Sequence, residues 1–209
     1  MPDLFIITGS NGAGKSTVGP DYLPDYIKEN YTVFDGDLLY TNKLSELFPE
    51  EIPSPKYARL EALNYVTKLF NEQTSEALAK GNNYVYEGHF TNDETWESPK
   101  KFKASGYTIH LIFFGLENPE LSQLRVTERV SEGGHYVDKS TLEANFYGNL
   151  EKLNIYHPFI NNLTIVDTSE IDHKILFKTA NYKLEYSIAK EFMPGWFITY
   201  LPSLLKMIR

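Results

Sequence analysis

Short apolar runs alternate with longer stretches of mixed polar and apolar residues along most of this chain. Each apolar run has the length of a buried strand, and the stretches between the runs contain helical spacings of apolar positions. Strands and helices that alternate in this way are typical of a parallel sheet, because parallel neighbours need a crossover connection. The pattern therefore predicts a three-layer α/β/α fold with a mainly parallel sheet of about five strands. The predicted strands are Leu4–Thr8, Tyr31–Phe34, Tyr84–Tyr86, Thr108–Phe114 and Leu163–Val166.

Start and stop signals place helices between these strands. The longest is predicted over Ser54–Lys80, with Pro55 at its first position and Gly81 after its last turn. Apolar side chains of this helix lie near one stripe, which predicts that they belong to the core. These side chains are Tyr57, Leu60, Leu63 and Phe70. Further helices are predicted over Thr91–Ala104, Asn118–Ser131 and Ser140–Leu153.

Beyond Ile171 the pattern changes to a hairpin and a tail. Ile175–Lys178 and Tyr182–Ser187 are predicted to pair as antiparallel strands around a turn at Ala180–Asn181. The amphipathic segment Phe197–Ile208 is predicted to pack across the core, and the less favoured alternative is a partner-binding surface. We therefore expect residues 1–170 to form one domain and residues 171–209 to form a hairpin and helix extension packed on it.

The residues that follow the first strand match the phosphate-binding motif G-x-x-x-x-G-K-[ST] over Gly9–Ser16. Glycines let the backbone amides approach a polyphosphate, Lys15 reaches the β- and γ-phosphates, and the Ser16 hydroxyl is placed to ligate Mg²⁺. A helix that opens at Thr17 adds a favourable dipole for the anion. The motif predicts that the chain binds ATP or another nucleoside triphosphate with Mg²⁺. The predicted nucleotide-binding residues are Gly9, Ser10, Asn11, Gly12, Ala13, Gly14, Lys15, Ser16 and Thr17.

Composition narrows the possible partners. The 209 residues carry a net charge of −8, which argues against nucleic-acid binding, since such proteins need a basic face. The chain has no cysteine, so a disulfide framework and a thiolate metal site are both excluded. We see no signal peptide and no apolar run of the roughly 20 residues that a membrane span needs. We therefore expect a cytoplasmic protein that uses neither a membrane nor nucleic acid.

Acidic residues follow the second and third predicted strands. Asp35 and Asp37 come after the second strand, while Glu87 and His89 come after the third. Ligands of open α/β sheets bind outside the carboxyl ends of the strands, so these side chains are candidates for substrate binding and proton transfer. The alternatives are that an aspartate only caps the next helix and that His89 is a structural histidine.

Two arginines, Arg125 and Arg129, are four residues apart on a predicted helix and therefore share a face. The helix leads into Gly133-Gly134, and the glycines would suit the hinge of a lid around residues 125–150 that closes over the triphosphate. Phosphoryl transfer needs such arginines, because charge builds on the transferred oxygens. The alternative is a solvated face that pairs with Glu128 or Glu132.

Three stretches together resemble the zeta-toxin-like P-loop kinases. They are V-F-D-G-D at residues 33–37, Y-E-G at 86–88 and L-R-V-T-E-R-V-S-E-G-G-H-Y-V at 124–137. The resemblance covers about Leu4 to Ser169 and fades in the tail. It implies ATP-dependent phosphorylation of the 3′-hydroxyl of a UDP-linked N-acetyl amino sugar. It also implies an antitoxin-like protein partner.

The same resemblance implies a role for each matching residue. Asp37 would be the general base, and Glu87 would lie on the substrate side. Arg125 and Arg129 would approach the transferring phosphate, and Asp167 would lie near the nucleotide base. Lys15 and Ser16 would hold the phosphates and Mg²⁺, as the motif itself predicts.

Two departures from the family pattern leave the acceptor open. Gly88-His89 stands where the family commonly has Thr-Thr, and Glu143–Phe146 replaces an arginine-rich segment. Lysine does not replace the planar donors of arginine well, so the loss weakens phosphate binding from that segment. The alternative to a kinase is a non-catalytic nucleotide-binding switch or partner-recognition module. A plain ATPase or GTPase is favoured less, since no guanine-reading N-K-x-D occurs.

Overall fold

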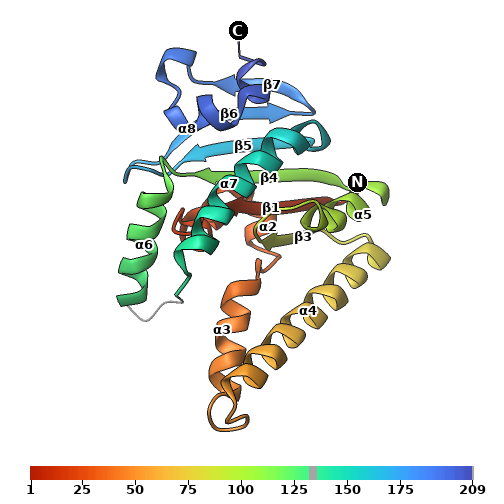
Figure 1. Ribbon diagram of the computed structural model, residues 1–209. Helices are drawn as coiled ribbons and strands as arrows, with labels where there is room; N and C mark the ends of the chain where they lie inside the picture. The colour runs from red at the N-terminus through yellow and green to blue at the C-terminus, as the bar shows by residue number, and fades with distance from the viewer. Residues whose placement is uncertain (132–135, 209) are drawn as a thin grey trace.

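The computed structural model describes residues 1–131 and 136–208, and its strands form one seven-stranded sheet (Figure 1). The strands are β1 (Asp3–Gly9), β2 (Phe34–Asp35), β3 (Tyr84–Glu87), β4 (Thr108–Gly115), β5 (Asn162–Asp167), β6 (Lys174–Ala180) and β7 (Lys183–Ser187). Their order is β2-β3-β1-β4-β5-β6-β7, with β1 to β5 parallel and β6 and β7 antiparallel. The prediction of a mainly parallel sheet with a C-terminal hairpin is confirmed, and the hairpin extends the sheet itself.

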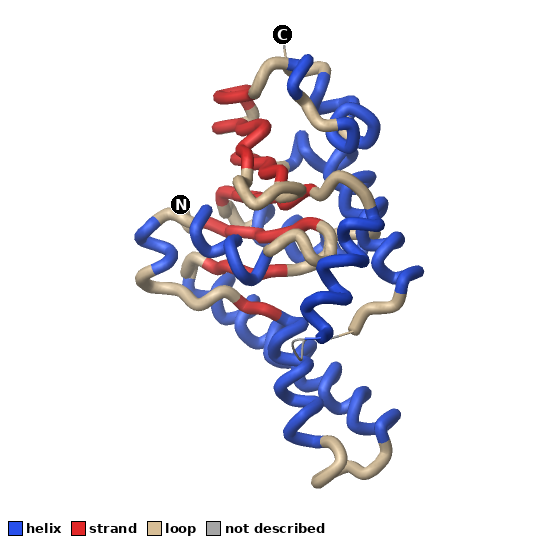
Figure 2. Tube along the Cα trace, turned by 90° about the vertical axis from the view of Figure 1, so that its left-hand side faces the viewer, coloured by secondary structure: helices blue, strands red, loops and turns tan. Residues whose placement is uncertain are grey.

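Helices lie on both sides of this sheet, as the two views in Figures 1 and 2 show. The helices are α1 (Lys15–Val18), α2 (Asp25–Lys28), α3 (Gly36–Leu47), α4 (Pro55–Lys80), α5 (Glu97–Ala104), α6 (Pro119–Ser131), α7 (Lys139–Tyr156), α8 (Gly195–Tyr200) and α9 (Pro202–Leu205). Short 3₁₀ segments span Gly19–Tyr22, Glu94–Trp96, His157–Phe159 and Lys190–Phe192. The three-layer prediction is therefore confirmed. Within residues 1–131 and 136–208, no helix combines the length and the apolar character that crossing a bilayer requires.

The centre of the core comes from β1 and β4, which pair in parallel from Asp3↔Thr108 to Gly9↔Phe114. Their side chains are almost continuously buried, as expected for strands covered on both faces. His110 is a polar residue in the middle of β4. Its ring stacks on Phe5, and its Nε2 lies 3.0 Å from Asp3 Oδ1, so it has a structural role.

An arm built from α3 and α4 extends away from the sheet (Figures 1 and 2). The prediction that Tyr57, Leu60 and Leu63 belong to the core is wrong, since these side chains are 64%, 51% and 55% exposed. The buried face of this half of α4 consists of Ala58 and Ala62 instead. The N-terminal half of α4 packs against α3 through these small residues, and its large apolar side chains remain on the surface.

Two predicted element boundaries also differ from the structure. The second strand is limited to Phe34–Asp35 because β2 is an edge strand that pairs with only two residues of β3. The helix predicted to start at Thr91 starts later, since Asn92 Oδ1 accepts a hydrogen bond from the Thr95 N–H and so caps the turn that follows.

The tail packs on the rest of the chain. Trp196, Phe197, Leu201, Leu204 and Ile208 are all at most 4% exposed and belong to the main hydrophobic cluster. Both α8 and α9 contact α7. These tail residues thus pack on the rest of the chain, while the division of the chain near residue 170 stays a prediction.

We expect Gly115→Ala to destabilise the fold, because the added Cβ would lie 2.2 Å from the buried ring of Trp196. Overpacking of this kind costs about 1 to 3 kcal/mol. Chemical denaturation measures the loss. The matched control is Gly195→Ala, whose Cβ would meet no atom within 4 Å. Equal stabilities of the two variants would contradict the close packing of the tail on β4.

Candidate functional site

The segment between β1 and α1 has the backbone geometry of a phosphate-binding loop. Gly9 has φ +138°, and a Cβ there would lie 2.1 Å from the carbonyl oxygen of Phe114. Gly14 lies in the left-handed region at φ +80° and is the N-cap of α1, which begins at Lys15 rather than at Thr17. The motif glycines therefore allow a close approach to β4 and a sharp entry into the helix.

Lys15 lies at the centre of the candidate site. Its side chain is 7% exposed, and Nζ donates to the Ser10 carbonyl oxygen at 3.1 Å. Burial lowers the pKa of Lys15, and the charge of Arg129 lowers it further, while Glu87, Asp37 and Asp35 oppose the shift. Three of the predicted carboxylates and one predicted arginine thus interact electrostatically with Lys15.

Sheet register explains how Glu87 reaches this place. Glu87 pairs with Ile7 of β1 and with Asp35 of β2, so three neighbouring strands end at the same edge. Its Oε2 accepts a hydrogen bond from Ser16 Oγ at 2.9 Å, and its Oε1 lies 3.9 Å from Lys15 Nζ. Burial raises the pKa of Glu87, and Lys15 opposes this shift.

The donors near Ser16 fit a magnesium ion that is held mainly by phosphate oxygens and water. Among the described residues, no group of three or more His, Asp or Glu side chains could hold a metal by itself. Mg²⁺ keeps several waters and takes few protein ligands when it binds with a nucleotide. Ser16 Oγ, at the start of α1, is the ligand expected from the motif.

Asp35 and Asp37 differ in their surroundings. Asp35 Oδ1 accepts a hydrogen bond from the Leu38 N–H at 3.0 Å, so it caps α3 as the alternative reading proposed. The side chain of Asp37 is exposed in the first turn of α3 and lines a groove between α3 and α4. Asp37 is therefore the better placed of the two to meet an acceptor.

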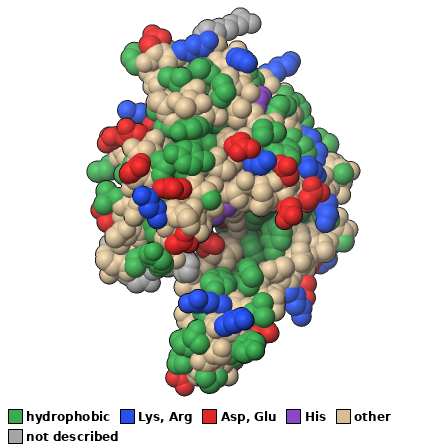
Figure 3. All heavy atoms as spheres, viewed as in Figure 1, with side chains coloured by type: hydrophobic (Ala, Val, Ile, Leu, Met, Phe, Trp, Pro, Cys, Tyr) green, Lys and Arg blue, Asp and Glu red, His purple; other side chains and the backbone are tan. Residues whose placement is uncertain are grey.

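The groove between α3 and α4 has a volume of about 1060 Å³. Its inner end is formed by Gly36 and Asp37, and the rest is mostly apolar. Figure 3 shows the surface hollowed where the arm meets the rest of the molecule. The remaining lining residues include Tyr40, Lys56, Tyr57, Arg59, Leu60, Leu63 and Val66. The groove therefore connects Asp37, near the edge of the sheet where the carboxylates lie, with an apolar surface that carries two cations, Lys56 and Arg59.

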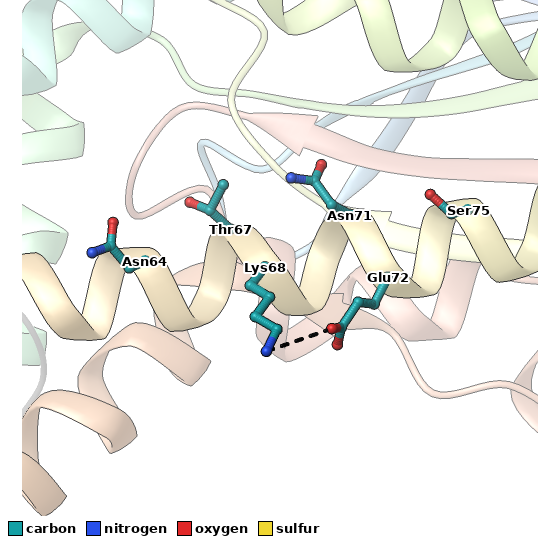
Figure 4. A pocket seen from close by; sticks show the side chains of 6 residues that line it. All are labelled: Asn64, Thr67, Lys68, Asn71, Glu72 and Ser75. Carbon is teal, nitrogen blue, oxygen red and sulfur yellow. Dashed lines mark ion pairs between the residues drawn. The ribbon is translucent and has the colours of Figure 1, made fainter.

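A second hollow lies along the middle of α4 and does not contain the predicted site residues (Figure 4). Polar side chains line it, and Lys68 pairs with Glu72 across one helical turn at 3.8 Å. The lining residues are Asn64, Thr67, Lys68, Asn71, Glu72 and Ser75. An exposed ion pair of this kind contributes little stability and supplies no reactive group.

Arg125 of α6 contacts the phosphate-binding loop, whereas Arg129, one turn further along, is exposed. Arg125 donates to the carbonyl oxygens of Gly12 at 3.4 Å and Ser169 at 2.9 Å, and thereby bridges the loop and the segment after β5. The charge of Arg129 reaches Lys15. A wholly solvated arginine face does not fit these contacts. The predicted hinge at Gly133-Gly134 and the alternative partner Glu132 lie outside the described residues.

Residues that follow β5 also contact the phosphate-binding loop. Asp167 Oδ1 accepts hydrogen bonds from the Ser169 N–H and hydroxyl, so this carboxylate is engaged in its own turn. Thr168 Oγ1 lies 3.1 Å from the carbonyl oxygens of Ala13 and Gly115. Thr168 therefore anchors the loop to β4, a role that the sequence did not reveal.

Polar side chains of α6 and α7 also support the phosphate-binding loop, and these residues were not predicted from the sequence. Ser122 Oγ donates to the Asn11 carbonyl oxygen at 2.6 Å, and Asn145 Nδ2 donates to Asn11 Oδ1 at 2.8 Å. Asn149, one turn further along α7, is 1% exposed and reaches the Gly9 carbonyl oxygen at 3.4 Å. The only available signal was the spacing of the two asparagines, four residues apart within a predicted helix.

His89 contacts this support and is partly buried. Its Nδ1 lies 3.1 Å from Asn149 Nδ2, and its buried Nε2 has no hydrogen-bond partner among the described residues. Burial lowers the pKa of His89 well below its ordinary value, and the charge of Lys15 lowers it further, while a hydrogen bond with the Gly9 backbone opposes the shift. Burial thus disfavours the charged form of the ring.

Comparison with known proteins gives one family match. A family model described as Zeta toxin matches residues 1–173. A curated relative, an uncharacterised protein of Haemophilus influenzae (strain ATCC 51907 / DSM 11121 / KW20 / Rd), is 23% identical over 138 residues. The match covers 66% of this chain and 88% of the relative.

Among the solved structures that resemble the whole chain, two come from complexes or systems with a named partner. One comes from the PezAT chromosomal toxin-antitoxin system of Streptococcus pneumoniae, with 18% identity, a TM-score of 0.66 and coverage of 100% of this chain and 78% of that one. The other is the AvrRxo1-ORF1:-ORF2 complex with ATP, with 15% identity, a TM-score of 0.66 and coverage of 100% and 77%. At these low sequence identities, the two structures support the fold of this chain and no more than the fold.

Proposed function

We propose that this chain, which belongs to the zeta toxin family, is an ATP-dependent kinase that phosphorylates a hydroxyl group of a small-molecule acceptor. Its family and fold support the broader description of a P-loop kinase-like phosphotransferase that uses ATP. The observation that carries the finer proposal is the group of charges around Lys15. Carboxylates from two strand ends and from α3 act on the charge of Lys15, and Arg129 acts on it from α6.

In the proposed reaction, the loop amides and Lys15 hold the β- and γ-phosphates of ATP. Mg²⁺ bound through Ser16 would neutralise charge on the phosphate oxygens. Asp37 accepts the proton of the acceptor hydroxyl while that oxygen attacks the γ-phosphorus, and ADP leaves. Arg129 stabilises the charge that spreads over the transferred oxygens, and Arg125 keeps the loop in place through Gly12.

For the acceptor we propose a UDP-linked N-acetyl amino sugar, bound in the groove between α3 and α4. The groove starts at Asp37, its volume of about 1060 Å³ suits a molecule of this size, and Lys56 and Arg59 supply charges for a diphosphate. Tyr40 and Tyr57 offer aromatic surface for the base and sugar.

We also propose an antitoxin-like protein partner. The PezAT structure belongs to a toxin-antitoxin system, and AvrRxo1-ORF1 is seen with AvrRxo1-ORF2. Their overall fold resembles that of this chain, which supports a partner of the same kind but leaves its binding surface to experiment.

The proposal is tested by measuring ADP release from ATP and Mg²⁺, with and without UDP-N-acetylglucosamine. A kinase for this acceptor releases ADP rapidly only in its presence and yields a phosphorylated sugar nucleotide. Equal release without acceptor would indicate a simple ATPase. Tight ATP binding with no ADP under either condition would favour the nucleotide-binding switch, which the arginine-poor segment Glu143–Phe146 suggests.

A further inference from the structure

The groove between α3 and α4 carries an exposed apolar stripe that a polar acceptor does not explain. On α4 the stripe consists of Tyr57, Leu60 and Leu63, and each of these side chains is more than half exposed. They are three residues apart, so they follow one side of the helix. A sugar nucleotide can use the aromatic ring and the cations of the groove, but it gains little from exposed leucines. Contiguous apolar surface with polar residues around it is typical of a site that binds another protein.

The arm formed by α3 and α4 does not cover this stripe by itself. The buried apolar residues of the arm, Leu47, Ala58 and Ala62, form a small cluster apart from the main core. At the outer end of the arm, no third helix of the described chain lies beside α3 and α4 (Figures 1 and 2). The large side chains of the stripe are therefore available to an element from outside the chain.

The shape of the groove favours a helix as that element. The groove follows α4 from Pro55 to Val66, and Gly36, Asp37 and Tyr40 line it from α3. At 1.5 Å per residue this part of α4 is about 17 Å long, which is the length of three helical turns. Both walls are helices, whose backbone groups are already bonded, so a partner strand has no free edge to pair with. A third helix can instead insert its side chains between those of α3 and α4.

Two cations of the groove indicate the charge of the partner. Lys56 and Arg59 line the groove, and neither forms an ion pair with a residue in the described part of the chain. Asp37 is the one acid among the described lining residues, so the groove has an excess of positive charge although the whole chain carries −8. A helix with carboxylates beside an apolar stripe complements both the cations and the leucines, whereas a basic helix would be repelled.

We propose that the groove between α3 and α4 binds an acidic, amphipathic helix of a partner protein, and that this helix excludes the acceptor. The binding surface stands on the groove alone, and only the exclusion of the acceptor rests on the proposed function. The carboxylates of the helix meet Lys56 and Arg59, the cations that would otherwise hold the diphosphate of the acceptor. The helix also covers Asp37 at the inner end of the groove, while the phosphate-binding loop stays open to ATP.

The binding surface is tested with three synthetic peptides and the full-length protein. The first peptide repeats leucine at helical spacing with glutamates on both flanks, the second has lysines in place of the glutamates, and the third has the scrambled sequence of the first. A side-chain staple keeps each peptide helical, and fluorescence anisotropy measures the Kd. The first peptide is expected to bind at least about tenfold more tightly than the other two. Equal binding of the acidic and the basic peptide, or no binding of the acidic one, overturns the proposal.

Matched variants locate the bound peptide. Leu63 in the groove and Leu124 on α6 are both 55% exposed, so replacing either with aspartate should leave the fold intact. Leu63→Asp is expected to weaken binding of the acidic peptide by about tenfold or more, and Leu124→Asp is expected to leave it unchanged. The double variant Lys56→Glu, Arg59→Glu should prefer the basic peptide. Equal losses in the two leucine variants, or a double variant that still prefers the acidic peptide, would place the peptide elsewhere and overturn the proposal.

Exclusion of the acceptor is tested by calorimetric titration with UDP-N-acetylglucosamine, and separately with Mg²⁺ and adenylyl imidodiphosphate, each with and without the acidic peptide. We expect the peptide to raise the apparent Kd of the sugar nucleotide and to leave that of the ATP analogue unchanged. Displacement of the ATP analogue instead would overturn the exclusion of the acceptor. A sugar nucleotide that fails to bind even without peptide would contradict the proposed acceptor, while the peptide measurements, which use no acceptor and no ATP, would still decide the binding surface.

Discussion

Replacing Asp37 with asparagine is expected to lower kcat for phosphoryl transfer by about 10²- to 10⁴-fold, the usual contribution of a general base. The affinity for ATP should change little, because Asp37 lies on α3 and not in the phosphate-binding loop. The amide keeps the size of the side chain and removes its ability to take a proton. Steady-state kinetics at saturating ATP, together with calorimetric ATP titration, measures both quantities.

The matched control for this prediction is Asp35→Asn. Asparagine caps helices as well as aspartate does, so the bond to the Leu38 N–H and the start of α3 are kept. Asp35 and Asp37 both act on the charge of Lys15, so the two variants remove comparable charges from the site. Similar losses in the two variants would mean that charge, rather than proton transfer by Asp37, explains the effect.

Replacing Arg129 with lysine is expected to lower kcat by roughly 10³-fold or more, within the range for arginines that stabilise phosphoryl transfer. Lysine retains the positive charge but not the planar pair of donors. Arg129 acts on Lys15, so losing its paired donors should affect the transferring phosphate rather than the acceptor. Single-turnover kinetics with radiolabelled ATP measures the transfer step.

Arg125→Lys provides the comparison within the same helix. Arg125 donates to the carbonyl oxygens of Gly12 and Ser169, so its loss should loosen the loop and raise KM for ATP more than it lowers kcat. If Arg129→Lys transferred phosphate at the wild-type rate, the assignment of Arg129 to the transition state would be wrong.

Features with local signals were predictable from the sequence. The nucleotide motif needs glycines at fixed places, and the apolar strands of a doubly covered sheet form continuous runs such as Thr108–Phe114. Glu87 and Asp35 meet because parallel strands end at one edge, so strand order alone brings them together. For this reason the parallel sheet, and the presence of carboxylates at one of its edges, could be predicted from the alternation of strands and helices.

The arm was not predictable in the same way. The apolar stripe of α4 that contains Tyr57, Leu60 and Leu63 has the spacing of a core-facing surface, yet this half of the helix extends beyond the sheet. Apolar spacing reports which side chains share a face and not whether another element covers that face. The small residues Ala58 and Ala62, which pack against α3, gave no comparable signal.

Support of the phosphate-binding loop also escaped prediction, because it depends on contacts between distant residues. Thr168 and Asn149 reach the loop across more than 130 positions of sequence. A lone threonine or asparagine has no pattern that distinguishes a buried anchor from a surface residue. Their roles become visible only when the fold places α7 and the end of β5 beside the loop.

The most direct test of the central claim is mass spectrometry of a cell metabolite extract incubated with the protein, Mg²⁺ and ATP labelled with ¹⁸O in the γ-phosphoryl group. We predict a new small molecule that is heavier by one labelled phosphoryl group and is absent when Asp37→Asn replaces the wild type. Label that stays in ATP, or appears only in inorganic phosphate, would contradict the proposal that this chain is a small-molecule kinase.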